Sequence, residues 1–447
     1  SGDTISITSG ASLDIGGSVS GSDGTVNWDT TKKTAAFTAE AGRGYFVDTT
    51  SAAITVTLPA SPSAGDLVAV KDYAFTADTN NITIARNGSN IQGAANDFLI
   101  DTEGRSVTLI YVDATQGWLL TGASQKSDIT GPLFTVATGG TITTCGDFKI
   151  HTFTGPGTFS VTQIGNSGDL PSGGPAVVDY LVVAGGGSAG AGDRQSRGSA
   201  AAGAGGFRES HSDPVSGPYT ASPLATPTGI TLTVQDYPIT VGAGGATPPA
   251  GPNNVGGNSG SNSVFSSITS AGGGAGQAAG GAGGSAGGSG GGTRANPPQP
   301  PGFAGNTPPV SPPQGNRGEA GAAASVATAE RGGGGGGATA AGSSGPQLGA
   351  GGAGAGTQIN PAVGEPGPSC LTYFAGGGAG GGFGPAFAAV LGGIGGGADR
   401  PDPPTWANGE AGTANTGGGG SGTKGHPGAG STGTSGGAGG SGIVVIR

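Results

Sequence analysis

One segment of the chain has the spacing of a catalytic nucleophile. Gly186-Gly-Ser188-Ala-Gly190 matches the Gly-x-Ser-x-Gly pattern of a nucleophile elbow, and a run of strand-forming residues precedes it. An elbow must open a helix, whereas the residues after Gly190 show no helical pattern, and the same spacing recurs at 283–287. We therefore interpret Ser188 as part of a glycine tract and expect no hydrolase.

Histidine and cysteine side chains are the other candidates for catalysis or metal binding. His151, His211 and His426 lie in different segments, so spacing ties none of them to a serine or a carboxylate, and we expect solvated or loop residues. Cys145 and Cys370 stand far apart in unlike contexts, which predicts two unpaired thiols rather than a disulfide or a zinc cluster. The sequence therefore predicts a protein that is not an enzyme and holds no cofactor and no metal.

Composition limits both the fold and the partners. The chain has 447 residues, and its 103 Gly and 31 Pro make up about 30% of them, which argues against long helices. The 17 Lys+Arg against 27 Asp+Glu give a net charge of -10, which disfavours binding to a phosphate backbone. A run of eighteen apolar residues is also missing. We expect an all-β protein with no nucleic-acid partner and no membrane insertion.

The first 26 residues form a segment of their own. Ile5, Ile7, Leu13 and Ile15 alternate with polar residues in two short runs that a Ser-Gly turn separates, which is strand spacing. Two such short strands cannot stand alone, and copies from neighbouring chains would bury their apolar side chains. Residues 1–26 are therefore expected to form a β neck that assembles a homotrimer.

Residues 27–124 have the strand spacing of a β-sandwich or jelly roll. Turn signals separate eight short runs of strand-forming residues, at 33–37, 44–48, 54–58, 67–72, 82–86, 98–101, 106–112 and 117–120. The aromatic residues expected in its core are Trp28, Tyr45, Phe46, Phe98, Tyr111 and Trp118. Five further runs in residues 125–184 predict a small β platform that precedes the glycine-rich segment.

Residues 185–447 hold 79 of the 103 glycines. Ordering each residue costs about 1–2 kcal/mol, so a tract without side chains needs many main-chain contacts to stay folded. Polyproline II helices have three residues per turn and no internal hydrogen bonds, which leaves their amides and carbonyls free for neighbouring helices. In residues 280–292, glycines 281, 284, 287 and 290 recur at that period. We predict a bundle of short polyproline II helices within one chain, closed by a strand at 443–447. Collagen is the nearest alternative, but it requires an unbroken Gly-X-Y register, and these tracts last only a few turns before a loop interrupts them.

Several of these motifs resemble a known family. Val178-Asp-Tyr-Leu-Val-Val-Ala-Gly-Gly-Gly187, Gly205-Gly-Phe-Arg208 and the closing Gly-Gly-Ser-Gly-Ile-Val-Val-Ile-Arg resemble the glycine-rich domain of phage tail-fibre and virion structural proteins, notably of marine and cyanobacterial viruses. The likeness covers roughly 133–447, and the preceding β domain is similar to one found in the same class of fibres. The resemblance implies a virion location, contacts with other virion or fibre proteins, and loops that bind a host-surface glycan or protein.

Aromatic and arginine side chains between the tracts are the candidates for such binding. Side chains of this kind on rigidly held loops make good anchors for a partner surface, and the residues concerned are Phe207, Arg208, Tyr373, Phe374 and Trp406. The alternative is that these residues cap the ends of the bundle. Two functions therefore remain open, a tail fibre that attaches to a host and a purely structural filament or capsid-surface fibre without a receptor.

Overall fold

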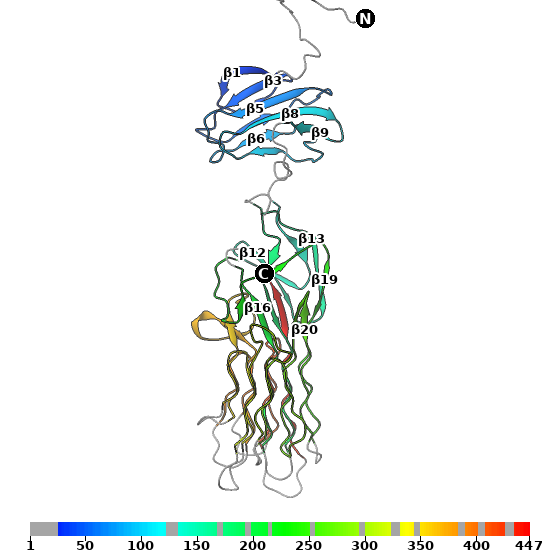
Figure 1. The fold of residues 1–447 in the computed structure, drawn as a ribbon, viewed down its shortest axis with the longest axis vertical. Helices are drawn as coiled ribbons and strands as arrows, with labels where there is room; N and C mark the ends of the chain where they lie inside the picture. Colours follow the sequence, from blue (N-terminus) through cyan, green and yellow to red (C-terminus); the bar gives the residue numbers. More distant parts are fainter. Residues whose placement is uncertain are drawn as a thin grey trace, which may run out of the picture. The chain divides into compact units, whose positions relative to one another are not determined.

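A computed structural model describes residues 26–121, 133–167, 173–192, 198–212, 217–250, 255–294, 300–322, 331–343, 349–382, 389–400, 407–424 and 433–447. The chain divides into two compact units, and the all-β prediction is confirmed (Figure 1). Unit 1 contains the sequence up to Leu133 together with Asn166–Gly174, and unit 2 contains Phe134–Gly165 and Pro175–Arg447. The predicted neck lies outside the described residues except for Val26.

Unit 1 is a sandwich of two sheets. The first has the order β1 (Asn27–Lys33), β3 (Arg43–Val47), β5 (Leu67–Asp72), β8 (Ser106–Asp113) and β9 (Gly117–Leu120). The second has the order β2 (Phe37–Thr38), β4 (Ile54–Thr57), β6 (Ile82–Ala85) and β7 (Phe98–Ile100). From β1 to β6 the chain alternates between the sheets, and successive strands of each sheet pair in parallel. A jelly roll is antiparallel, so this pairing departs from that expectation.

The sandwich core confirms some of the expected aromatic residues. Trp118, Phe98 and Tyr45 are buried, and Tyr111 packs against the same cluster. Trp28 is 37% exposed, and its ring lies 4.9 Å from that of Phe46. The strand expected at 33–37 is instead a turn, because β1 ends at Lys33 and β2 begins at Phe37.

Unit 2 begins with a platform of two sheets. One has the order β10 (Val136–Thr138), β13 (Gly157–Gln163), β19 (Asp236–Thr240), β20 (Ser263–Phe265) and β21 (Ile268–Ser270). The other has the order β11 (Thr141–Cys145), β12 (Phe148–Phe153), β25 (Ile443–Ile446), β15 (Tyr180–Val183), β16 (Phe207–Ser210) and β17 (Ala225–Thr226). Platform strands thus lie on both sides of residue 184, the boundary drawn from the sequence.

The closing strand β25 joins the platform to two apolar clusters. Its four residues are at most 1% exposed, and they alternate between the two faces of the sheet. Val444 and Ile446 pack in one cluster with Phe159 and Phe265 of the other sheet, whereas Ile443 and Val445 pack with Phe207 and Phe374. Strand alternation of this kind places one strand in two cores at once.

Two small sheets complete unit 2. The first pairs β14 (Val177–Val178) with β18 (Ile230–Thr231). The second has the order β22 (Ala355–Thr357), β24 (Thr372–Phe374) and β23 (Glu365–Pro366), and a single 3-10 turn, η2 (Pro368–Cys370), precedes β24.

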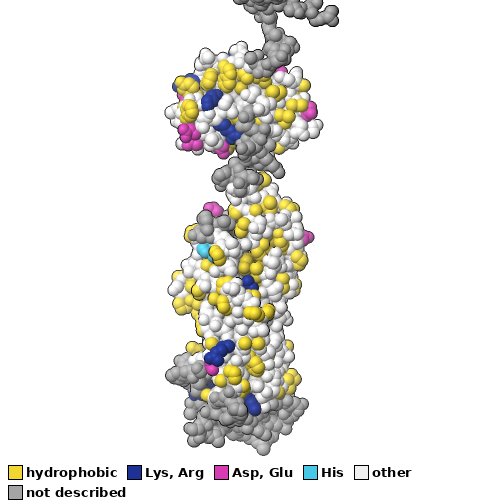
Figure 2. Space-filling model, in the orientation of Figure 1, with side chains coloured by type: hydrophobic (Ala, Val, Ile, Leu, Met, Phe, Trp, Pro, Cys, Tyr) yellow, Lys and Arg dark blue, Asp and Glu magenta, His cyan; other side chains and the backbone are white. Residues whose placement is uncertain are grey.

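The glycine tracts leave and re-enter the platform as extended segments that run side by side (Figure 1). They hydrogen-bond to one another through main-chain atoms, mostly between residues far apart in the chain. The face seen in Figure 2 carries few charged side chains along the bundle. This arrangement agrees with the predicted polyproline II bundle, whose helices are satisfied laterally.

The tract at 198–206 lies at the centre of the bundle. Its amides point in turn to three neighbouring tracts with a period of three residues. The amides of Ala200, Gly203 and Gly206 donate to the carbonyls of Gln277, Gly274 and Ala271 in the first neighbour. Those of Ala201 and Ala204 donate to Gly333 and Gly336 in the second neighbour. Those of Ala202 and Gly205 donate to Gly420 and Gly417 in the third, and all seven distances are 2.8–3.1 Å. Its carbonyls accept from three other tracts, through the amides of Gly187, Ser289, Gly292, Gly378 and Gly381. Six tracts therefore surround this one.

The continuous helix expected at 280–292 is wrong. Gly281, Gly283 and Gly284 have φ values of +99°, +68° and +88°, and the amide of Gly281 donates to the carbonyl of Ala278 at 2.9 Å. The chain therefore turns between two tracts here. Glycine is favoured both in tight turns and in closely packed helices. The glycines at 281 and 284 serve the turn, so their spacing of three does not indicate a helix.

Candidate functional site

Two of the five recognition residues expected from the sequence belong to the core. Phe207 on β16 is 1% exposed and Phe374 on β24 is 0% exposed, and both pack in the cluster beneath β25. Their role as receptor anchors is therefore wrong, because a partner reaches neither ring in this fold. Phe207 follows one glycine tract and Phe374 precedes another, so the burial of the two rings attaches these tracts to the platform.

The other three candidates differ in their surroundings. Arg208 and Tyr373 are partly exposed, and Trp406 lies outside the described residues. The Tyr373 ring packs against main chain, because a Cβ added at Gly367 would lie 2.6 Å from it. One part of the Tyr373 ring thus lies against Gly367, and another part is exposed to solvent.

The motifs with catalytic spacing have structural surroundings. Ser188 is buried in an extended tract, and its Oγ accepts the amide of Asn258 at 2.8 Å. His151, expected in a loop or in solvent, is instead 4% exposed on β12, where Nδ1 lies 2.8 Å from the carbonyl oxygen of Gly139. Burial lowers the pKa of His151. His211 lies 3.3 Å from the carbonyl of Gly217, and His426 is not among the described residues.

Both described cysteines are free and exposed, which confirms the two unpaired thiols. In the part of the chain that the structure describes, no group of three or more His, Cys, Asp or Glu side chains is placed to hold a metal ion. A recognition surface is the other kind of candidate site.

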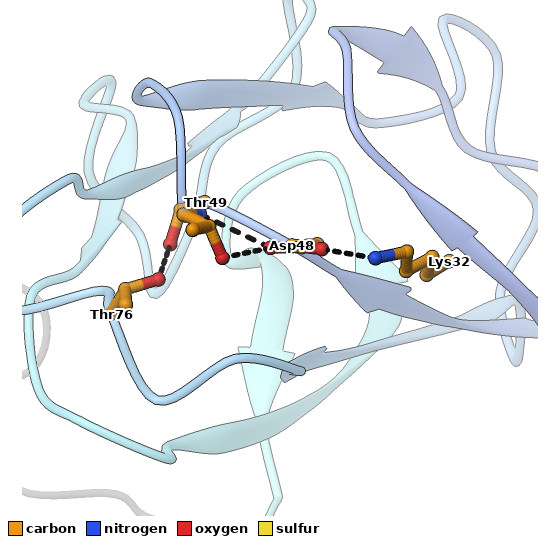
Figure 3. Close-up of polar contacts among 5 residues, drawn as sticks. Lys32, Asp48, Thr49 and Thr76 are labelled. Atoms are coloured by element: carbon orange, nitrogen blue, oxygen red, sulfur yellow. Dashed lines mark hydrogen bonds and ion pairs between the residues drawn. The ribbon is translucent and has the colours of Figure 1, made fainter.

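The sandwich carries such a surface where β1, β3 and β5 end. Parallel pairing brings the ends of these three strands to one edge of the sheet, since Lys33 pairs with Val47 and Val47 pairs with Asp72. We call Lys32, Asp48, Thr49, Tyr73 and Thr76 the strand-end cluster. Figure 3 shows how Lys32 and the two loops converge.

Hydrogen bonds fix the geometry of the strand-end cluster. Lys32 Nζ lies 2.7 Å from Asp48 Oδ2, and the other carboxylate oxygen accepts from the amide and hydroxyl of Thr50 (Figure 3). These contacts, with the Lys32 ammonium the largest cause, lower the pKa of Asp48 from 3.8 to about 2. Thr49 and Thr76 join their hydroxyls at 2.8 Å, which ties the loop after β3 to the loop after β5.

The loop after β5 carries two exposed aromatic side chains, Tyr73 and Phe75. Tyr73 is 49% exposed with Lys32 Nζ 5.2 Å from its ring centre, and Phe75 is 57% exposed with Lys71 Nζ 5.1 Å away. Phe75 also has φ of +59°, a conformation that is rare for a bulky residue and tends to occur at functional sites. Exposed rings beside cations and hydroxyls are suited to stacking on a sugar or a protein side chain.

Hydrogen bonds to a buried carboxylate fix this loop. Asp72 is fully buried, and its Oδ2 accepts the amides of Gly104 at 2.8 Å and Ala77 at 3.3 Å. Within the described residues its Oδ1 has no hydrogen-bond partner. Tyr73 and Phe75 were not among the recognition residues expected from the sequence, although two aromatic residues directly after the run predicted at 67–72 are a visible signal.

The glycine-rich part of the chain matches a known family. Residues 162–447, well over half of the chain, match the family model described as a glycine-rich domain, and the chain belongs to that family. No curated protein matches the chain. Among the helical segments that the structure describes, none has the length and apolar character needed to cross a membrane.

Proposed function

We propose that this protein is a non-enzymatic tail-fibre or other virion fibre protein that attaches to a host surface. The six-neighbour tract at 198–206 carries this proposal, because a bundle bonded on all sides through its main chain is a stiff scaffold. Stiffness lets a fibre present side chains without an ordering cost at the moment of contact. The partner is a host-surface glycan or protein, and the location is the virion.

The strand-end cluster, together with Phe75 of the same loop, supports attachment over a purely structural role. A filament without a receptor has no need for two half-exposed aromatic rings at a tightly bonded loop, and such rings are typical anchors at interfaces. The structural filament remains the second candidate, favoured by the burial of Phe207 and Phe374, which removes two anchors from the bundle.

Binding of the labelled chain to whole cells tests this function. A fluorescent chain would be incubated with a panel of marine cyanobacterial and other bacterial strains, and flow cytometry would measure retention. We expect selective retention on some strains, with a loss of about tenfold in Tyr73→Ala/Phe75→Ala. Leu99→Ala, which also removes a half-exposed apolar side chain of the sandwich, is the matched control.

Two results would favour the structural filament. One is the absence of retention on every strain, and the other is equal retention of the aromatic double variant and the wild type. Arg208→Ala/Tyr373→Ala/Trp406→Ala, measured in the same assay, would show whether the bundle contributes to binding.

Assembly into a homotrimer is part of the proposal. Three copies would repeat each binding surface and raise the effective affinity without any new contact. Sedimentation of the full chain would give the mass, and Ile5→Asp/Ile7→Asp is expected to shift it to that of the monomer. A wild-type chain that sediments as a monomer at all concentrations would contradict the trimer.

A further inference from the structure

A groove with a volume of about 480 Å³ lies on the platform, and none of the residues discussed as recognition candidates lines it. The segment that follows β17 and contains β18 forms one side, and the hairpin turn between β20 and β21 forms the other. Tyr180 of β15 also lines it. The volume falls in the range of small-ligand sites, which is roughly 300–1,000 Å³.

Four exposed hydroxyl groups line the groove. Thr228, Thr231, Ser266 and Ser267 are exposed, and in the described part of the chain their hydroxyls make no hydrogen bond. Each hydroxyl can both donate and accept. A ligand that fills the groove can therefore pair with these groups through donors, acceptors or both.

The apolar surface of the groove and the absence of charged lining residues restrict the chemical class of the ligand further. Ile230 and Ile268 also line the groove, and both pack against the apolar cluster between the two platform sheets. The groove has no Lys, Arg, Asp or Glu among its lining residues. A neutral ligand with an apolar C–H face and a rim of hydroxyls meets these demands, and a sugar ring has that chemistry.

A buried network fixes the groove from behind. Asp179 is fully buried, and its carboxylate accepts Ser210 Oγ at 2.6 Å, Ser212 Oγ at 3.1 Å and the Ser212 amide at 2.7 Å. Ser212 Oγ in turn accepts the amide of Gly229, which lines the groove, at 2.6 Å. The wall beside Thr228 is therefore held by a charge-assisted network before any ligand arrives.

The opposite wall is set by a tight turn. Phe265 pairs with Ile268 across a two-residue hairpin, and Ser266 has φ of +53°. Such a turn holds Ser266 and Ser267 outward at a fixed distance from the strands. Both walls are thus preorganised, which lowers the ordering cost of binding.

We infer that this groove binds one or two units of a neutral saccharide. The inference deepens the proposed attachment function and rests on it, because a surface glycan would supply the saccharide. Binding would be direct, through the four threonine and serine hydroxyls, with the isoleucines against the C–H face of the ring.

Saturation-transfer NMR on the full chain tests the inference. The probes are methyl glycosides of glucose, mannose, galactose and N-acetylglucosamine, with glucuronic acid and N-acetylneuraminic acid as charged counterparts. We expect transfer to at least one neutral glycoside and roughly tenfold weaker binding in Ser267→Trp, which fills the groove from an exposed turn. Thr143→Trp, at the opposite edge of the same platform, is the control and should bind like the wild type.

Three outcomes would overturn the inference: no transfer to any neutral glycoside, a preference for the charged sugars, or equal binding by Ser267→Trp and the wild type. Cell retention separates this test from that of the proposed function. Retention that Ser267→Trp leaves unchanged would refute a role for the groove in attachment while the proposed function stands. Sugar binding by a chain that no cell retains would support the groove and contradict host attachment.

Discussion

A Cβ added at Gly335 would lie 1.7 Å from the carbonyl oxygen of Ala202. Real Cβ atoms do not approach a carbonyl oxygen so closely, so glycine at this position is required by a neighbouring main chain rather than by a turn. The relationship is general in the bundle, since Gly291 meets the carbonyl of Ala275 at 1.9 Å in the same way. Close approach of this kind is what allows lateral main-chain hydrogen bonds between the tracts.

Gly335→Ala is therefore expected to loosen the bundle. Overpacking a closely packed site costs about 1–3 kcal/mol, and here the obstacle is main chain that cannot rotate away. Hydrogen exchange of peptides that cover 198–206 should accelerate. Gly155→Ala is the matched control, because nothing lies within 4 Å of its Cβ position. Equal exchange in the two variants would contradict the packing argument.

Asp48 gives the sandwich a pH dependence at the acid end. Its pKa falls from 3.8 to about 2 in the folded chain, so the folded state binds a proton less readily than the unfolded state. The stabilisation is full above pH 4 and is lost as the pH falls through the folded value. Urea titrations followed by Trp118 fluorescence should show a midpoint that declines between pH 4 and pH 2. Asp48→Asn should flatten that decline, and an equal decline in the variant would contradict the assignment.

Glu209 contributes a pH dependence of stability whose sign is opposite to that of Asp48. Burial raises its pKa above the ordinary value of 4.5, although Ser222 and Thr357 both donate to its carboxylate. The folded state therefore binds the proton more readily, and stability falls as the pH rises from 4.5 through the folded value. Hydrogen exchange in β16, corrected for the intrinsic pH effect, should accelerate over that window. Glu209→Gln should remove the dependence, and a dependence that persists in the variant would assign it to another group.

The glycine bundle was predictable in kind but not in detail. Glycine content points to closely packed polyproline II helices, and the interrupted periods favour short helices of one chain over a collagen triple helix. Tract-to-tract pairing was beyond prediction, since one glycine tract resembles another and nothing local ties Ala201 to Gly333. The turn at Gly281–Gly284 was missed for the same reason: glycine carries no side chain to distinguish a turn from a close contact.

Most strands of the sandwich followed from the spacing of turn signals, except β1 and β2 around the run expected at 33–37, whereas the parallel pairing did not. Turn residues mark where a strand ends but leave the order of strands in a sheet open. The strand-end cluster depends on that order, because Lys32 and Tyr73 meet only when β1, β3 and β5 lie parallel. Phe207 and Phe374 were misassigned because aromatic residues beside glycine tracts suit a core as well as an anchor.

The last prediction concerns the strand that links platform and bundle. Val445 on β25 is fully buried in the cluster that contains Phe207 and Phe374. Val445→Asp would bury an unpaired charge in that cluster, a change expected to cost more than about 4 kcal/mol. Because the chain divides into two compact units, limited proteolysis should degrade unit 2 while Trp118 fluorescence still reports a folded sandwich. Thr143→Asp, on the exposed edge strand β11, should leave both units resistant. Simultaneous loss of both units in Val445→Asp would mean that the sandwich depends on the platform for its stability.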